Sequence, residues 1–321
     1  MKRSAAVLSL ALSLLPAMPA IAQDAEAFPS KPVHLVVPFP PGGPLDISGR
    51  LIGKELQERW GQSVIVENKP GSTIGPESVA KSAPDGYTLM IISSTPLVTL
   101  PHLQKVPYDV LKDLVGVTQT TLLTYALVVT PASGIVSIED LIAKAKRSPG
   151  KLNYASAGNG SGQHLYMELL KAAAGIDLTH VPYKGAAPAL QAVMAGQVPM
   201  MLDVTVATVP LVKSGKARAI LVTGSKPLEQ LPGAVPFDSL FPGLGIPGWH
   251  GIFAPGATPR PVLEKLAADI RAVLQLPAVA NRFRELGVEP SGVSGGQFEE
   301  IVRRDYERWG EIIRRNGLRA D

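Results

Sequence analysis

The chain has 321 residues, a formal net charge of +4 and no cysteine, and hydrophobic residues make up 45% of it against 18% for charged ones. The lack of cysteine excludes disulfides, thiolate metal sites and a cysteine nucleophile. The small positive charge gives no reason to expect a nucleic-acid partner. At about 150 residues per domain, the length favours two domains with a sizeable core each.

The first 22 residues have the pattern of a secretory signal peptide. Lys2 and Arg3 precede an apolar run over residues 5–15, and Ala20-Ile21-Ala22 fits an A-x-A cleavage site. The apolar run is short for a bilayer span, and no other uncharged run of spanning length follows in the sequence. We therefore predict cleavage after Ala22 and a mature protein outside the cytoplasm.

Residues 33–50 predict a buried strand that turns abruptly into a helix. Residues 33–37 are a largely β-branched apolar run, and the prolines and glycines from Pro38 to Pro44 exclude regular structure. Asp46 is placed to cap the helix that follows. A helix start offers unpaired N–H groups and the positive end of the helix dipole, which suit a carboxylate or phosphate. The alternative is a plain connection that binds nothing.

Further strands are predicted at residues 63–67 and 87–92, separated by a helix near residues 77–81. The second strand ends at three hydroxyl residues, Ser93, Ser94 and Thr95. Ligands bind at the carboxyl ends of strands in open parallel sheets, so Ser93 and Thr95 would face the same space as the first glycine turn. A hydroxyl-capped turn without a ligand is the alternative.

Residues 152–170 repeat this arrangement of strand, glycine-rich turn and helix start. The turn contains Ser156, Gly158 and Ser161, and the helix after it has an apolar face. Two such turns facing each other would surround a small anion with main-chain N–H groups and hydroxyls. Neither turn contains lysine or arginine, so we expect dipoles and hydrogen bonds to hold the charge, at about 0.3–1 kcal/mol per helix end.

Five longer motifs occur in an order that resembles the periplasmic receptors of tripartite tricarboxylate transporters, often called Bug receptors. They read PFPPGGPLD, APDGYTL, YASAGNGSGQHL, VPYKGAAPALQAVMAGQVPMMLD and IFAPGATP, and the similarity spans essentially the whole mature chain. The resemblance implies an α/β periplasmic-binding-protein (venus flytrap) fold, with a ligand cleft between two lobes. It implies no catalysis and no cofactor. It also implies a periplasmic receptor that captures a small organic carboxylate and delivers it to membrane permease subunits.

The motifs also imply which residues hold the ligand. They are Pro41, Gly42, Gly43, Asp46, Ala155, Ser156, Ala157, Gly158, Ser161, His164 and Asp203. Ser93 and Thr95, which follow from the strand end described above, complete the predicted ligand-binding residues.

Four positions depart from the family pattern. Ala155 replaces a common glycine, Pro199 an acidic residue and Val204 a polar one, so the wall near Asp203 is less polar and argues against a ligand with many hydroxyls. His250 stands where the family more often has an aromatic ring, and we leave it out of the predicted site.

The resemblance further suggests that a strand over residues 217–222 returns the chain to the first lobe. Lobe one is then predicted to comprise residues 23–124 and 224–321, and lobe two residues 125–223.

Other motif matches are weaker. Residues 243–248 satisfy G-x-G-x-x-G, but no strand precedes them and no helix follows, which excludes a dinucleotide site. Residues 292–296 satisfy G-x-S-x-G but precede the last helix, where a helix-start turn is the better account. Ser161 and His164 define the main alternative, a secreted serine hydrolase, although Ser161 is better placed as a helix cap and no nearby carboxylate would orient His164. The five histidines show no metal-ligand spacing, so we predict no metal.

Overall fold

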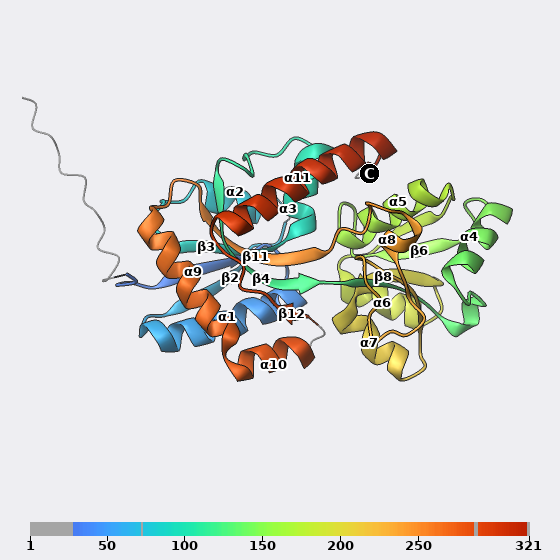
Figure 1. The fold of residues 1–321 in the computed structure, drawn as a ribbon, viewed down its shortest axis with the longest axis horizontal. Coiled ribbons are helices and arrows are strands. Elements are labelled where there is room, and N and C mark those ends of the chain that lie inside the picture. Colours follow the sequence, from blue (N-terminus) through green and yellow to red (C-terminus); the bar gives the residue numbers. More distant parts are fainter. Residues whose placement is uncertain (1–27, 72, 286–287, 320–321) are drawn as a thin grey trace, which may run out of the picture.

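The structure is a computed structural model that describes residues 28–71, 73–285 and 288–319. The predicted signal peptide lies outside the described residues. Two six-stranded sheets with helices packed around them form two lobes side by side (Figure 1).

Lobe one contains the first part of the chain and the last. Its sheet has the strand order β12-β4-β11-β3-β1-β2, with parallel pairing among β2, β1 and β3 and antiparallel pairing elsewhere. Its elements are β1 (Val33–Val37), α1 (Pro44–Trp60), β2 (Val64–Asn68), α2 (Ile74–Ala80), β3 (Thr88–Ser93), α3 (Ser94–Leu103), β4 (Leu114–Leu123), β11 (Gly248–Pro255), α9 (Arg260–Gln275), α10 (Pro277–Glu285), β12 (Glu289–Pro290) and α11 (Gly296–Asn316).

Lobe two contains the middle of the chain. Its sheet has the order β10-β9-β5-β8-β6-β7, and only β5 runs against its two neighbours. Its elements are β5 (Tyr125–Val129), a 3-10 turn (Pro131–Ser133), α4 (Ile138–Arg147), β6 (Asn153–Ser156), α5 (Gly162–Ala174), β7 (Thr179–Pro182), α6 (Ala186–Met194), β8 (Met200–Val204), α7 (Thr205–Lys213), β9 (Arg218–Val222), β10 (Val235–Pro236) and α8 (Phe237–Leu240).

The first passage between the lobes fixes how the two sheets face each other. β11 pairs antiparallel with both β3 and β4, so β4 ends at the same sheet edge as β3. β5 pairs antiparallel with β8, so it begins at the edge where β8 ends. Thr124 is the single residue between β4 and β5. The carboxyl ends of the parallel strands of both lobes, where ligands bind in such sheets, therefore lie at the junction of the lobes.

The second passage differs from the sequence prediction. The chain was expected to return to lobe one directly after the strand over residues 217–222, which was predicted to be the last part of lobe two. This strand, β9, does lie in the second sheet, but the later strand β10 pairs with it there. Residues 224–240 therefore belong to lobe two, and the chain returns to lobe one between α8 and β11, over residues 241–247. The pairing of the two-residue strand β10 with β9 decides this, and no local pattern predicts it.

Aromatic rings fill the space between the first sheet and α11. Trp249, Phe253 and Phe298 have ring centroids 5.2–6.0 Å apart and are at most 1% exposed. A Cβ on Gly251 would stand 2.5 Å from the Phe298 ring, so this glycine lets the helix approach the sheet. Full burial of one such ring contributes about 1.5–3 kcal/mol to folding. This packing fixes α11 over the strands that lead to the junction.

Candidate functional site

The proline and glycine turn after β1 is held by the side chain of Asp46. The Asp46 carboxylate accepts hydrogen bonds from Gly42 N at 2.9 Å, Asn68 Nδ2 at 2.9 Å and Arg50 Nε at 3.0 Å. Asp46 was predicted to cap α1, but the helix begins at Pro44 with Gly43 as its cap, and Asp46 lies within its first turn. The carboxylate reaches back to the turn because Gly42 has a φ of 83°, which glycine tolerates.

These hydrogen bonds also keep the Asp46 carboxylate ionised and paired at the start of α1. Burial by itself would raise the pKa of Asp46, but the hydrogen bonds from Arg50, Gly42 and Asn68 hold that pKa below its usual range. Arg50 lies 3.0 Å from the carboxylate and neutralises it. Pro41 and Gly42 are exposed beside this pair. The turn therefore offers an exposed main chain without an uncompensated negative charge.

The hydroxyls predicted after β3 lie at the start of α3. Ser93 is the helix cap, and Thr95, 1% exposed, lies in the first turn. Both lie beside the hydroxyl of Tyr125, the first residue of β5, and burial raises the pKa of Tyr125 to about 12. Ser94 Oγ accepts from Trp249 N at 3.1 Å. The start of α3 in lobe one thus meets the first strand of lobe two.

The second glycine turn is closed by hydrogen bonds of its own. Ser156 is fully buried; its Oγ accepts from Gly158 N at 3.0 Å and lies 2.6 Å from His180 Nε2. His180 stacks on His164 with ring centroids 4.1 Å apart. Burial, and to a smaller extent the charge interaction with His164, lowers the pKa of His180 to about 4. Ala155 is buried in β6, while Ala157 and Gly158 are half-buried. The Ser156 hydroxyl therefore shapes the turn.

The start of α5 combines a side-chain cap with open main-chain donors. Ser161 caps the helix and accepts from His164 N at 3.3 Å, as the sequence predicted, while His164 Nδ1 accepts from Gly160 N at 3.1 Å. Within the part of the chain that the structure describes, the N–H groups of Gly162 and Gln163 have no recorded acceptor. Two donors at the positive end of a helix dipole are thus available.

Asp203 lies at the end of β8 and is 1% exposed. Its Oδ1 accepts from Val204 N at 2.8 Å and from Gln163 Nε2 at 3.1 Å. Burial raises the pKa of Asp203 to about 6, although both hydrogen bonds act against this rise. The carboxylate therefore connects the start of α7 to the start of α5.

The structure brings the start of α5 into contact with the start of α3. A Cβ on Gly162 would lie 2.8 Å from Tyr125 Oη and 3.2 Å from Thr95 Oγ1, and one on Gly160 would lie 3.1 Å from Leu100. The predicted residues Thr95, Ser161 and His164 are thus gathered at one place, whereas Pro41 and Gly42 are exposed.

Sequence reasoning missed Tyr125, Gly162 and Gln163. Gly162 and Gln163 follow Ser161 directly, so the helix-start pattern was a signal for them. Tyr125 begins an apolar strand and carries no local signal, because its role comes from the passage between the lobes.

The second passage is held by side chains from three helices. Asp238 of α8 accepts from Gly243 N at 2.9 Å and Gly245 N at 3.1 Å. Arg308 of α11 donates to the Gly243 carbonyl, and Tyr166 of α5 donates to the Ile246 carbonyl. The G-x-G-x-x-G segment that was set aside for nucleotides is therefore the second connection between the lobes.

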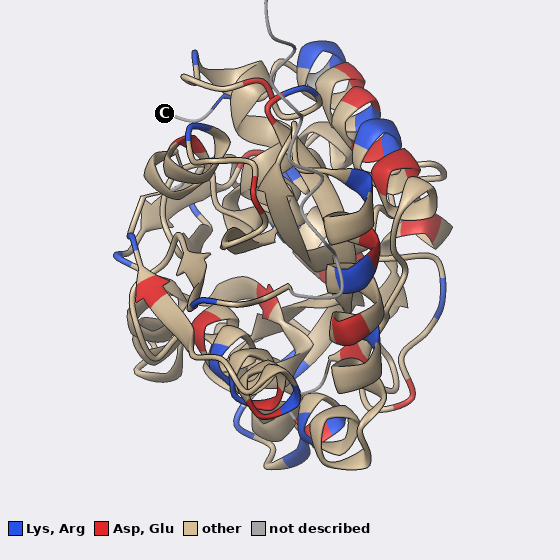
Figure 2. Cartoon of the chain, turned by 90° about the vertical axis from the view of Figure 1, so that its left-hand side faces the viewer, with Lys and Arg blue, Asp and Glu red and all other residues tan. Residues whose placement is uncertain are grey.

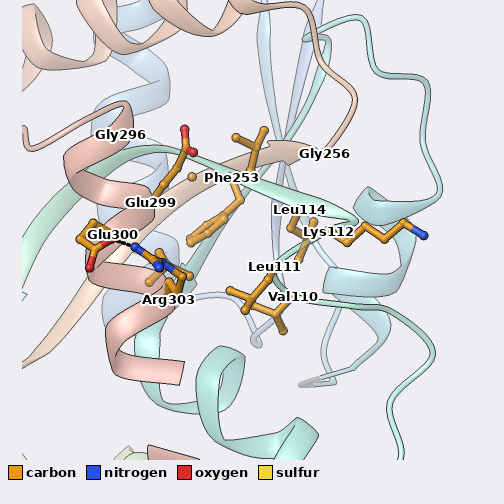
Figure 3. A pocket seen from close by; sticks show the side chains of 13 residues that line it. Val110, Leu111, Lys112, Leu114, Phe253, Gly256, Gly296, Glu299, Glu300 and Arg303 are labelled. Atoms are coloured by element: carbon orange, nitrogen blue, oxygen red, sulfur yellow. Dashed lines mark hydrogen bonds and ion pairs between the residues drawn. The ribbon is translucent and has the colours of Figure 1, made fainter. Parts of the chain in front are cut away.

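A cavity of about 420 Å³ lies elsewhere, within lobe one (Figure 3). It is lined by Leu111 and Lys112 on one side and by Glu299, Glu300 and Arg303 of α11 on the other, and Arg303 is paired with Glu300. None of the predicted ligand-binding residues lines it. It is separate from the junction of the lobes.

Charges are mixed over the surface. In Figure 2, basic and acidic residues alternate along the helices that face the viewer. On α11, Arg303 and Arg304 are paired with Glu300 and Asp305. Among the described residues, no helix is long and apolar enough to cross a membrane, and no cluster of histidine and acidic side chains is arranged to hold a metal ion.

Comparison with known proteins identifies the family. The model of the tripartite tricarboxylate transporter family receptor matches residues 49–318. A relative from Pseudomonas sp. (strain P51), described as the UPF0065 protein in the tcbD-tcbE intergenic region, is 38% identical over 307 residues, which cover 94% of this chain and 90% of the relative. The family prediction made from the motifs is confirmed.

Solved structures agree in fold. R. palustris Rpa4515 with adipate has a TM-score of 0.82 and 32% identity, and the alignment covers 91% of this chain and 99% of that one. MatC (Rpa3494) from Rhodopseudomonas palustris with bound malate has a TM-score of 0.80 and 31% identity, with 89% and 100% covered. The two-lobed α/β fold is therefore confirmed.

The periplasmic binding protein BugD is also similar, with a TM-score of 0.81 and 32% identity over 91% of this chain and 99% of that one. Family and neighbour together indicate a periplasmic location and give no support to the serine hydrolase alternative. The chain is a solute-binding receptor, not an enzyme, and it belongs to the receptor family of tripartite tricarboxylate transporters.

Proposed function

We propose that this receptor captures a small dicarboxylate between its two lobes and delivers it to the membrane permease subunits of a tripartite transporter. The observation that carries the proposal is the pair of helix starts, α1 and α5, at the sheet edges that face each other across Thr124. The malate and adipate bound by the two solved relatives have a carboxylate at each end, and one helix start for each carboxylate fits such a ligand.

The proposed site comprises the exposed Pro41–Gly43 turn, the start of α3, and the start of α5 with its Gly162 and Gln163 donors. Four of the predicted residues support the site indirectly, because their side chains form hydrogen bonds to the turns and helix starts that contact the ligand. They are Asp46, Ser156, His164 and Asp203. Hydrogen bonds and helix dipoles replace a cationic side chain. Lys184, next to the second turn, is exposed.

A thermal-shift screen of mono-, di- and tricarboxylates tests the ligand class. A ligand at 100 times its dissociation constant stabilises the fold by about 2.7 kcal/mol, so dicarboxylates should raise the melting temperature most. Calorimetry then compares Ser161→Ala with Lys184→Ala. We expect the serine change to weaken binding and the lysine change to be silent; the opposite result would exclude the dipole account.

Lobe closure is proposed because each lobe supplies only part of the donors, and half a site would leave a carboxylate poorly satisfied. Small-angle scattering with a dicarboxylate from the screen should give a smaller radius of gyration than without it. An unchanged radius at saturation would contradict closure.

Processing after Ala22 belongs to the same proposal. Mass spectrometry of the protein recovered from a periplasmic fraction should give a chain that begins at Gln23. A chain that still carries Met1 would contradict the cleavage site.

A further inference from the structure

Three polar side chains form a row on one face of the first sheet, next to the junction of the lobes. His250 of β11 pairs with Ser93 of β3 on one side and with Thr121 of β4 on the other. Side chains of directly opposed residues in antiparallel strands share one face of the sheet. Ser93 is the cap of α3 and lies beside the Tyr125 hydroxyl, so the row begins at the proposed ligand site.

The imidazole of His250 has one nitrogen engaged and one open. Nδ1 lies 3.3 Å from Thr121 Oγ1. No described residue bonds to Nε2. The fully buried side-chain atoms without a hydrogen bond in the described part of the chain are Tyr108 Oη, Thr118 Oγ1 and Thr120 Oγ1, and Nε2 is not one of these buried atoms. Nε2 is therefore reached by solvent although the residue as a whole is only 7% exposed.

The surroundings keep the ring uncharged. Burial lowers the pKa of His250 to about 3, so the imidazole is neutral at any pH at which the protein would work. We infer that the Thr121 hydroxyl donates to Nδ1, which leaves the single proton of the neutral imidazole on Nε2. The open nitrogen is then a donor.

Gly248, two residues before His250 on β11, indicates which way the His250 side chain points. Gly248, two residues before His250 and thus on the same face, would place a Cβ 3.0 Å from the Tyr125 ring. Tyr125 in turn contacts Gly162 and lies beside Ser93 and Thr95. The face that carries His250 therefore leads into the junction where α3, β5 and α5 meet.

We propose that His250 is a ligand-binding residue that donates a hydrogen bond from Nε2 to a carboxylate oxygen of the bound ligand. The inference rests on the proposed function and adds a side-chain donor to a site otherwise made of main-chain groups. A neutral donor at this position binds an anion without a buried cation, which agrees with the lack of lysine and arginine in both glycine turns. Thr121 is a positioning residue that fixes the tautomer.

Calorimetry with malate and adipate tests the proposal on the mature protein. His250→Phe keeps a ring and removes the donor, so we expect the affinity for the better probe to fall about 10- to 100-fold, the range for a hydrogen bond to a charged group. His250→Gln keeps an N–H donor and should retain most of the affinity. His34→Gln is the matched control, since His34 is half-buried and bonds to Glu67 at the far sheet edge.

A second readout does not depend on a variant that folds. In the wild-type protein labelled with 15N at histidine, the Nε2–H signal of His250 should shift downfield when the probe binds. Equal affinities of His250→Phe and wild type, or an Nε2–H signal unchanged at saturation, would overturn the role of His250 while leaving the proposed function intact. If the wild type binds neither these probes nor any carboxylate in the screen, the proposed function fails and this inference fails with it.

Discussion

Gly162 at the start of α5 and Thr95 at the start of α3 touch across the two lobes: a Cβ on Gly162 would lie 3.2 Å from Thr95 Oγ1. The same Cβ would lie 2.8 Å from Tyr125 Oη, closer than real Cβ contacts allow. The lobes therefore meet at a position where only a glycine fits, one residue after the cap of the helix that offers open N–H donors.

Gly162→Ala should weaken ligand binding by at least about tenfold, or about 1.4 kcal/mol, because the methyl group forces α5 away from α3 and Tyr125. Calorimetry with a dicarboxylate from the screen measures this. Adding Tyr125→Phe, which removes the nearer oxygen, should restore part of the affinity. Gly296→Ala is the control, since nothing lies within 4 Å of a Cβ there; equal losses in both variants would show that the contact is unimportant.

Tyr166→Phe should lower the free energy of unfolding by about 1–3 kcal/mol, because the buried Ile246 carbonyl in the second passage would lose its donor. Urea denaturation followed by circular dichroism measures this. Tyr306→Phe is the matched control, since Tyr306 is half-buried and, among the described residues, its carbonyl but not its hydroxyl takes part in a hydrogen bond. A loss no larger than that of the control would mean that Tyr166 does not hold the passage.

Asp46→Ala should weaken dicarboxylate binding and destabilise the protein by about 2 kcal/mol, because Gly42, Arg50 and Asn68 lose a shared charged acceptor. The pKa of Asp46 is lowered in the fold, so its contribution is present above its ordinary pKa and is lost as the pH falls through the folded-state value. Denaturation curves at pH 7 and pH 3 should thus show a smaller difference between variant and wild type at pH 3. A constant difference would contradict the role of the charge.

Asp203→Asn should stabilise the protein at neutral pH. Burial raises the folded-state pKa of Asp203 from 3.8 to about 6, so the folded protein binds an extra proton between these values and loses stability as the pH rises through them. Asparagine has no charge to bury and keeps an oxygen for Val204 N and Gln163. The stability of the variant relative to wild type should therefore rise by about 2 kcal/mol between pH 4 and pH 7.

The control for Asp203 is Asp140→Asn on α4. Hydrogen bonds from Lys144 and the Val136 main chain lower the pKa of Asp140, so its pH dependence has the opposite sign. If the free energies of unfolding of Asp203→Asn and wild type differ by the same amount from pH 4 to pH 7, the pKa of Asp203 is not raised.

The sequence alone predicted the local elements that position the site. The apolar residues of β1 predict a buried strand, the glycines after β1 and β6 predict turns, and Ser161 predicts the cap of α5. Each of these predictions depends only on residues that are close in sequence. The ordered motifs also sufficed for the receptor family, which the comparisons confirm. The end of lobe two at residue 223 was misplaced because the short strand β10 is fixed by its pairing partner.

Only the tertiary structure decided what the polar side chains do. Asp46 closes a turn with Arg50 and Asn68, and Ser156 faces His180 from 24 residues away. Tyr125 joins the lobes from within an apolar strand. These partners come together through sheet order and the passage at Thr124, so they depend on contacts between distant segments. Local sequence fixes which conformations a segment can adopt, whereas the burial and partners of its side chains are set by the segments that pack against it.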